Sequence, residues 1–249
     1  MRAYADLHLH ASTENSLSEL LGKAKELGYR LVGVSIPIHT PKEERERLRD
    51  ACKRINLDLA FRVDLTPKSP RELLEALRAV RRRFELVSVL CLSKAVARCA
   101  ARDRRVDLLN FPPHPRGRFF DRSEAELASN SLSCLEIDMN CLLELRGASR
   151  ARLISKLRRE LKLAGKFGVP VVLSSGAKHP LTLRGPREYA ALAHILLDMG
   201  LEDALDAISE TPKSIVERNR EKLSPNFVAP GIRVVKVGGD CRGRSGGDT

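Results

Sequence analysis

The sequence predicts an α/β fold, namely an irregular barrel of the TIM type with about seven parallel strands and extra C-terminal helices. Its 249 residues contain short apolar runs, typical of buried strands, that alternate with segments whose apolar residues recur every three or four positions. This alternation indicates repeated βαβ units and a parallel sheet. The length suits a barrel, and seven strands instead of eight indicate an irregular one. An open doubly wound sheet is the alternative.

Capping signals mark where helices begin between the apolar runs. Ser16, Thr40 and Ser69 each precede a glutamate by three positions, which is the pattern of a capping box. Further helices are expected over 93–102 and 150–166, because apolar residues recur there at helical spacing. The strands are expected at 4–9, 31–36, 57–65, 86–92, 106–111, 135–139 and 169–173.

The C-terminal part of the chain shows only helical periodicity after the last expected strand. Residues 1–224 are therefore predicted to form a single barrel domain. Residues 225–249 are predicted to be an extension, with a short edge strand over 232–237 and a Gly-rich, disordered end over 238–249. The last helices are expected over 186–199, 201–209 and 212–223.

Composition limits the classes of partner. The formal net charge is +12, which favours a polyanion, either a nucleic acid or an anionic membrane surface. Aromatic residues make up only 4% of the chain and Trp is absent, so contacts to phosphates fit better than stacking on exposed bases. No apolar run is long enough to span a membrane, and no signal-peptide pattern is found. The six cysteines form no C-x-x-C pair, which predicts a reducing, cytoplasmic location.

Two loops rich in basic residues are candidates for binding a nucleic acid. One follows the last strand, where the small residues of Ser174-Ser175-Gly176 allow close approach, and the other is the Pro-rich loop after the fifth strand. In a parallel barrel both loops lie on the carboxyl rim, where ligands bind. The alternative is that these cations are simply solvated, and the same holds for 146–166, with eight Lys or Arg against one Glu. The candidates are Lys178, His179, Arg184, Arg187, His114, Arg116 and Arg118.

A possible metal site is indicated at the same rim. Asp6, His8 and His10 alternate on the first strand, so all three side chains are expected on one face. His39 follows the second expected strand, and Asp64 lies at the end of the third. Imidazoles and carboxylates suit zinc or manganese. The alternative is that these polar side chains bond one another without a metal.

The opening segment, Tyr-Ala-Asp-Leu-His-Leu-His at 4–10, resembles the first motif of the PHP (polymerase and histidinol phosphatase) superfamily. That resemblance implies a distorted seven-stranded barrel, metal ligands at the carboxyl rim and phosphoester hydrolysis. Two later motifs depart from it. Phe111 stands where the superfamily has a histidine, and Ser175 stands where it has an aspartate, so the site loses ligands that a hydrolytic centre needs.

One family within that superfamily matches the departures. Residues 174–233, together with the LEID and VDLLNF strands, resemble the protein component 3 family of ribonuclease P, its archaeal and eukaryal barrel subunit. The resemblance implies a noncatalytic subunit of the ribonucleoprotein that removes the 5′ leader from precursor tRNA. The expected partners are the catalytic RNA, precursor tRNA through the complex, a Pop5-type subunit and other ribonuclease P proteins. No catalytic residue, metal or cofactor is assigned. A metal-dependent phosphoesterase and a scaffold that binds only proteins are the alternatives.

Overall fold

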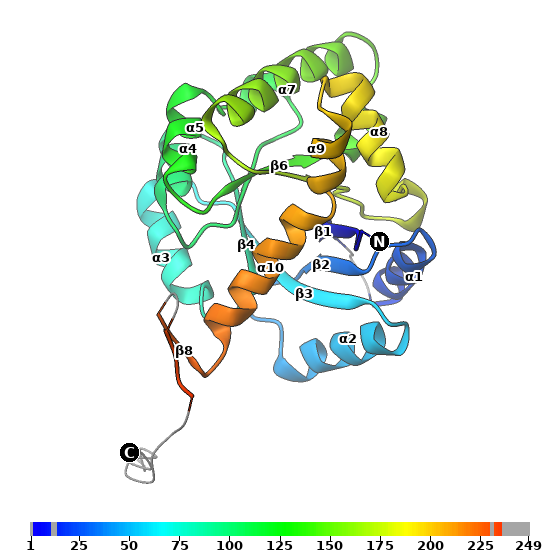
Figure 1. Cartoon of the computed structure of the whole chain (residues 1–249), viewed down its shortest axis with the longest axis vertical. Helices are drawn as coiled ribbons and strands as arrows, with labels where there is room; N and C mark the ends of the chain where they lie inside the picture. The colour runs from blue at the N-terminus through cyan, green and yellow to red at the C-terminus, as the bar shows by residue number, and fades with distance from the viewer. Residues whose placement is uncertain (1, 11–13, 230–231, 236–249) are drawn as a thin grey trace.

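A seven-stranded parallel sheet, ordered β1 to β7, curls into a nearly closed barrel in the computed structural model (Figure 1). The structure describes residues 2–10, 14–229 and 232–235. The fold predicted from the sequence is confirmed, and every predicted strand is present. The strands are β1 (Ala5–Leu9), β2 (Leu31–Ser35), β3 (Asp58–Leu65), β4 (Leu86–Leu90), β5 (Leu108–Asn110), β6 (Cys134–Asp138) and β7 (Val171–Ser174).

The seam between β1 and β7 is closed without an eighth strand. On the carboxyl side, an isolated bridge joins Leu9 of β1 to Ala177 in the loop after β7. On the amino side, the backbone N–H of Ala5 donates to the carbonyl oxygen of Ile208, and that of Leu173 donates to the carbonyl oxygen of Ala207, both at 2.9 Å. Because these hydrogen bonds satisfy the strand edges, a short connecting segment replaces the missing strand.

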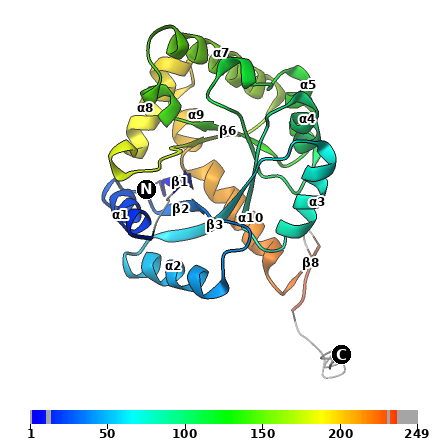
Figure 2. The ribbon, with the colours of Figure 1, turned by 180° about the vertical axis from the view of Figure 1, so that it is seen from behind.

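Helices surround the sheet and one crosses its amino end. Figures 1 and 2 show α10 (Glu210–Leu223) lying across the mouth of the barrel, where Ile215 and Val216 join the interior apolar cluster of Ala5 and Leu7. Within the described part of the chain, no helix combines the length and apolar character of a membrane span. The other helices are α1 (Glu14–Glu26), α2 (Lys42–Arg54), α3 (Pro70–Val80), α4 (Lys94–Arg102), α5 (Arg122–Ser129), α6 (Asn140–Glu144), α7 (Gly147–Phe167), α8 (Pro186–Leu197) and α9 (Leu201–Asp206), with the short turns η1 (Pro115–Gly117) and η2 (Pro180–Thr182).

The three residues predicted to cap helices differ in what they do in the structure. Ser69 caps α3 as expected, since its side chain accepts from the backbone N–H of Glu72. Thr40 does not cap α2, because its hydroxyl donates instead to the carbonyl oxygen of Pro37. Ser16 lies inside α1 and not before it. Two helices, α5 and α6, were not predicted because they are too short to show a clear period.

The chain after α10 forms a small antiparallel pair. The predicted edge strand is present as β9 (Ile232–Arg233), which pairs with β8 (Phe227–Ala229). The Gly-rich end over 238–249 lies outside the described residues, so its predicted disorder stays a prediction, as does the domain boundary at 224.

An irregularity in β1 turns a backbone carbonyl into the barrel. The register of β1 against β2 shifts between Asp6 and Leu9. The carbonyl oxygen of Leu7 thereby accepts a hydrogen bond from the interior Arg62, at 2.9 Å. Gly33 of β2 provides the space for this carbonyl group, because a Cβ at position 33 would lie 2.5 Å from the carbonyl oxygen. The glycine is therefore required by the close approach of two backbones.

Gly33→Ala should destabilise the fold by about 1–3 kcal/mol, because the added methyl group meets rigid backbone. Urea unfolding measures the change. Gly165→Ala is the matched control, since Gly165 is exposed in α7 and a Cβ there meets nothing within 4 Å. The control should gain about 0.5–1 kcal/mol through helix propensity. Equal effects of the two substitutions would contradict the proposed close approach.

Candidate functional site

Arg62 of β3 lies at the centre of the barrel with no exposed surface. Its guanidinium donates to both carboxylate oxygens of Glu136, at 2.5 and 2.7 Å. It also donates to Asp64 Oδ1 at 2.8 Å, to Ser88 Oγ at 2.9 Å and to the carbonyl oxygen of Leu7. These bonds use all five N–H donors of the side chain. A buried cation is therefore fully paired and fully hydrogen-bonded.

The Glu136 carboxylate is held from the other side of the barrel as well. Ser174 Oγ donates to its Oε1 and Asn110 Nδ2 donates to its Oε2, both at 2.8 Å. The same Asn110 amide donates to Asp138 Oδ2 at 2.9 Å. The network therefore joins side chains from β3, β4, β5, β6 and β7 across the interior, directly above the apolar layer that α10 closes.

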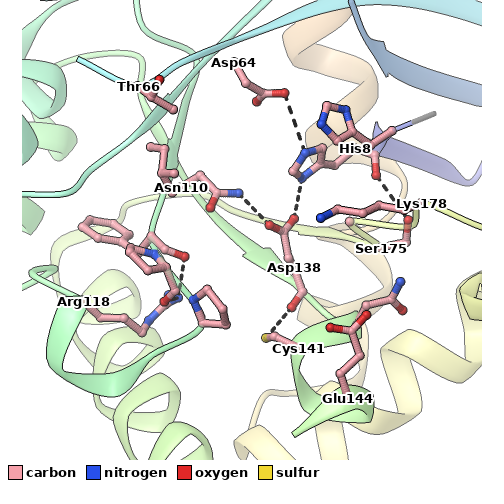
Figure 3. A pocket seen from close by; sticks show the side chains of 17 residues that line it. His8, Asp64, Thr66, Asn110, Arg118, Asp138, Cys141, Glu144, Ser175 and Lys178 are labelled. Carbon is pink, nitrogen blue, oxygen red and sulfur yellow. Dashed lines mark hydrogen bonds and ion pairs between the residues drawn. The ribbon is translucent and has the colours of Figure 1, made fainter. Parts of the chain in front are cut away.

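His8 completes this network at the carboxyl rim. Its Nδ1 lies 2.7 Å from Asp138 Oδ1, and its Nε2 lies 3.7 Å from Asp64 Oδ2 (Figure 3). Burial and the nearby Arg62 lower the pKa of His8, but Asp138 and Glu136 outweigh them and raise this pKa to about 9. Burial raises the pKa of Asp64, but Arg62 and His8 bring it below its usual range. His8 is thus an imidazolium between two carboxylates at neutral pH.

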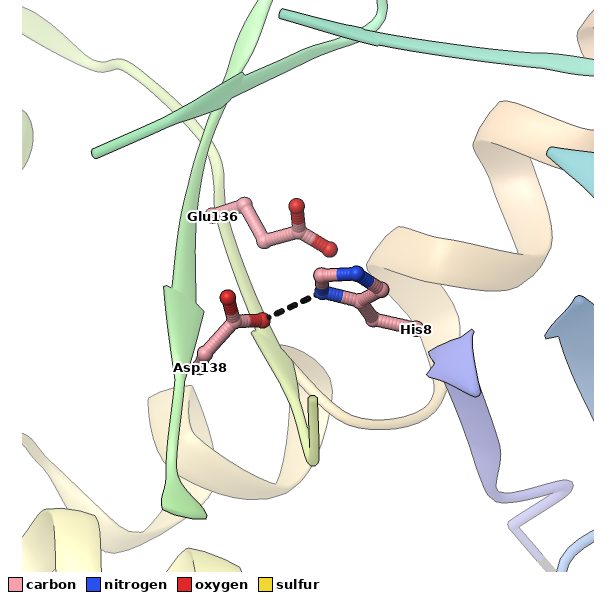
Figure 4. A group of neighbouring side chains, drawn as sticks. All are labelled: His8, Glu136 and Asp138. Atoms are coloured by element: carbon pink, nitrogen blue, oxygen red, sulfur yellow. Dashed lines mark hydrogen bonds and ion pairs between the residues drawn. The ribbon is translucent and has the colours of Figure 1, made fainter. Parts of the chain in front are cut away.

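The residues at this rim do not fit a metal ion. His8, Glu136 and Asp138 place potential ligand atoms within 4.8 Å of one another, which is a suitable size (Figure 4). His8 Nδ1 is, however, already hydrogen-bonded to Asp138 Oδ1, at 2.7 Å. Both oxygens of Glu136 accept hydrogen bonds from Arg62. The guanidinium already provides, beside these carboxylates, the positive charge that a metal would bring.

The predicted metal set does not assemble. Of its five members, His8 and Asp64 come together, and exposed His10 borders the same pocket, with its ring centroid 6.1 Å from that of His8. Asp6 does not share their face, because it is buried at the seam, where its Oδ1 accepts from the backbone N–H groups of His8 and of Ser175. His39 is exposed after β2 and does not line the pocket. The prediction of one shared face is therefore wrong.

The residues that the sequence interpretation missed are Arg62, Glu136 and Asp138. A signal for them was present, since Arg62 and Asp64 alternate on β3, and Glu136 and Asp138 alternate on β6. Charged residues two apart within apolar strands point to one face, and in a barrel that face is the interior. The metal prediction includes only Asp64 of these residues, and β6 enters only through the family resemblance, so this pattern was not used.

A pocket of about 390 Å³ opens above this network at the carboxyl rim (Figure 3). His8, Asp64 and Asp138 form part of its floor. Exposed Lys178 borders it from the loop after β7. Phe111 lines it with an aromatic ring that packs edge-on against Phe120. The lining mixes both charge signs with apolar rings. Cys141 and Ser175 also line it, and each donates a hydrogen bond to a backbone carbonyl oxygen, of Asp138 and of His8 respectively.

Some cations of the loop after β5 are exposed, and one is buried. His114 and Arg116 are exposed beside η1, as predicted for a surface loop. Arg118 is buried, because its guanidinium donates to both carboxylate oxygens of Glu160 in α7 at 2.6–3.1 Å and to the carbonyl oxygen of Phe111. The prediction that Arg118 contacts RNA is therefore withdrawn, since this side chain anchors the loop to α7.

The loop after β7 starts at the rim but does not stay there. Lys178, His179, Arg184 and Arg187 are all exposed. The turn η2 in this loop packs against α1 on the outside of the barrel. Arg187 Nε then reaches the hydroxyl of Tyr4, at 3.4 Å, and Tyr4 precedes the amino end of β1. The predicted basic surface therefore runs down the barrel wall and is not confined to the carboxyl rim.

The free energy of unfolding should fall as the pH rises through about 9. The pKa of His8 is about 9 in the fold against an ordinary 6.5, so its stabilising contribution is fully present below pH 6.5 and is lost above 9. The loss should be on the order of 2–3 kcal/mol. Urea unfolding of the native chain and of His8→Gln, each at pH 6, 7.5 and 9.5, isolates this contribution by difference. Parallel curves for the two proteins would show that His8 is not protonated in the fold.

Comparison with known proteins agrees with this geometry. The family model of RNase P subunit p30 matches residues 3–224. Ribonuclease P protein component 3 of Methanosarcina mazei is 32% identical over 238 residues, covering 94% of this chain and 96% of the relative, and that of Methanosarcina barkeri is 32% identical over 240 residues, covering 94% and 97%. A chain in the cryo-EM structure of archaeal ribonuclease P with mature tRNA has the same fold, with a TM-score of 0.81 and 24% identity over 92% of this chain and 98% of that chain. The chain thus belongs to the RNase P subunit p30 family.

Proposed function

We propose that this chain is the barrel subunit of ribonuclease P, the ribonucleoprotein that removes the 5′ leader from precursor tRNA. It supports the folded RNA of the particle, and the RNA performs the cleavage. Membership of the RNase P subunit p30 family over nearly the whole chain supports this assignment. The likeness to a chain of the archaeal particle supports it through the fold.

The single observation that carries the proposal is the guanidinium of Arg62 inside the barrel. A metal-dependent phosphoesterase of the PHP type needs free carboxylates and neutral imidazoles to hold its ions and to orient water. Here Glu136 and Asp64 are bonded to Arg62, and His8 Nδ1 is bonded to Asp138. The barrel therefore has the shape of such a hydrolase, but the charged side chains at its rim are bonded to one another in internal ion pairs.

The proposed partners follow from charge and exposure. A net charge of +12 and few aromatic residues favour contacts to the phosphates of a folded RNA. We propose the catalytic RNA as the direct partner and precursor tRNA as a partner through the complex. A Pop5-type subunit and other ribonuclease P proteins are the proposed protein partners, and the cytoplasm is the proposed location. The exposed RNA-binding candidates are Lys178, His179, Arg184, Arg187, His114 and Arg116.

Reconstitution tests this function. Archaeal ribonuclease P RNA is assembled with its protein subunits, with and without this chain, and 5′-leader removal from precursor tRNA is measured. Adding the chain should raise the rate of leader removal at limiting magnesium, because it stabilises the active fold of the RNA. The chain alone, supplied with manganese, should not cleave precursor tRNA or a model phosphodiester. Cleavage by the isolated chain that disappears in His8→Ala would instead support the phosphoesterase alternative.

A further inference from the structure

Helix α7 presents a continuous line of positive side chains along the outer edge of the molecule. Figures 1 and 2 show it at one edge of the structure, between α5 and α8. Its inner face is formed by buried Leu153, Leu157 and Ala164. At 100° per residue, four exposed cations fall within about 80° on the solvent-facing side of the helix and half-buried Lys156 flanks them, so that the five span about 21 Å along the axis. We call them the α7 stripe: Arg152, Lys156, Arg159, Lys162 and Lys166.

The four exposed members of the α7 stripe form no ion pair with a carboxylate of their own helix, and only half-buried Lys156 lies near one, Glu160. Glu160 is the one carboxylate of α7, and it is fully buried and bonded to Arg118. This ion pair therefore anchors the loop after β5 and also removes negative charge from the outer face of the helix. Arg158, which lies off the stripe, shows the contrast, because it is paired with Asp198 at 3.1 Å.

The side chains of the α7 stripe are available for binding. Arg152, Arg159, Lys162 and Lys166 are exposed, and Lys156 is half-buried. Among the described residues, none of the four exposed cations forms an ion pair. On α2, by comparison, Lys42 pairs with Glu46 and Lys53 pairs with Asp50. Unlike Lys42 and Lys53, the four exposed cations of the α7 stripe are not held in ion pairs among the described residues. Arg159 and Lys162 border a hollow that Asp198, Asp203 and Asp206 also line.

A hollow connects the α7 stripe with the predicted RNA-binding loop. His114 and Arg116 of the loop, with Ser149 and Arg152 of α7, line a depression of about 230 Å³. The cations of the loop after β5 thus continue directly into those of the helix. No large apolar side chain of α7 is exposed, whereas the centre of a protein–protein interface is usually apolar and poor in Lys. A chain of phosphates matches this surface better than a protein does.

We propose that the α7 stripe binds the phosphate backbone of the RNA subunit, along the outer wall of the barrel and separately from the loop after β7. This inference rests on the proposed function and deepens it by naming a contact surface. The contacts are made to phosphates without reading bases, so they position the RNA and carry a steep dependence on salt.

The experiment compares two four-fold variants that lower the net charge by the same amount. The stripe variant is Arg152→Gln, Arg159→Gln, Lys162→Gln and Lys166→Gln. The matched control, on α2, is Lys42→Gln, Arg47→Gln, Lys53→Gln and Arg54→Gln. Gln keeps a helix propensity close to that of Lys and Arg, so both proteins should melt near the native temperature. Lys162→Gln alone provides a milder variant whose folding is not in question.

Binding to archaeal ribonuclease P RNA, with the partner protein subunits present, is measured at several potassium chloride concentrations. The slope of log K against log salt should fall by about two to three for the stripe variant, by up to about one for Lys162→Gln, and by less than one for the α2 control. Affinity at the lowest salt concentration should drop about ten-fold or more for the stripe variant only.

Two results would overturn the proposal. One is a stripe variant whose salt slope equals that of the α2 control. The other is an unchanged RNA slope together with lost binding to a partner protein in the absence of RNA, which would assign the α7 stripe to a protein interface. If the proposed function itself is wrong, the result differs from both of these, because adding the native chain would then not increase RNA binding.

Discussion

The buried ion pair between Arg62 and Glu136 is the interaction on which the rest of the barrel depends. Removing two charges from water costs several kcal/mol per ion, and only close pairing with full hydrogen bonding offsets that cost. Five strands of the barrel contribute to holding this pair. β1 has a shifted register and β2 has a glycine, and hydrogen bonds come from the serines of β4 and β7 and from the amide side chain of β5. These local features make sense together, because each supplies a bond or the space for one. The barrel interior is thus apolar at the amino end and ionic at the carboxyl end.

This arrangement separates two populations of cations in a strongly basic chain. Arg62 and Arg118 lie inside, and each is matched with a buried glutamate, so they contribute to the architecture of the fold. The cations of α7 and of the loops after β5 and β7 lie outside and largely lack acidic partners. The two populations are connected, because the Arg118–Glu160 pair both positions a loop and keeps the one carboxylate of α7 away from the outer face of the helix. Because each of these buried arginines is neutralised by its glutamate, the two pairs add nothing to the net charge of +12, which belongs to the remaining residues.

Much of the fold was predictable from the sequence, whereas the site was predictable only in part. The strands were found because buried parallel strands are continuous apolar runs, which a local pattern reveals. The role of α10 was missed, since periodicity shows that Ile215 and Val216 are buried but not which mouth they close. Arg118 was misplaced because a basic residue in a Pro-rich loop looks exposed until its partner, 42 residues away in α7, is known. The charges on β3 and β6 gave a usable signal, since period two places Arg62 and Glu136 in the interior.

A double-mutant cycle on the central pair tests this account most directly. The free energy of unfolding is measured for the native chain, Arg62→Met, Glu136→Gln and the double variant. Arg62→Met should cost about 3–5 kcal/mol, because it leaves buried carboxylates without their counter-charge. The double variant should be more stable than Arg62→Met alone by at least about 1 kcal/mol, since one orphaned charge is then removed. Single effects that add to within about 0.5 kcal/mol would contradict the account, because the two side chains would then be energetically independent.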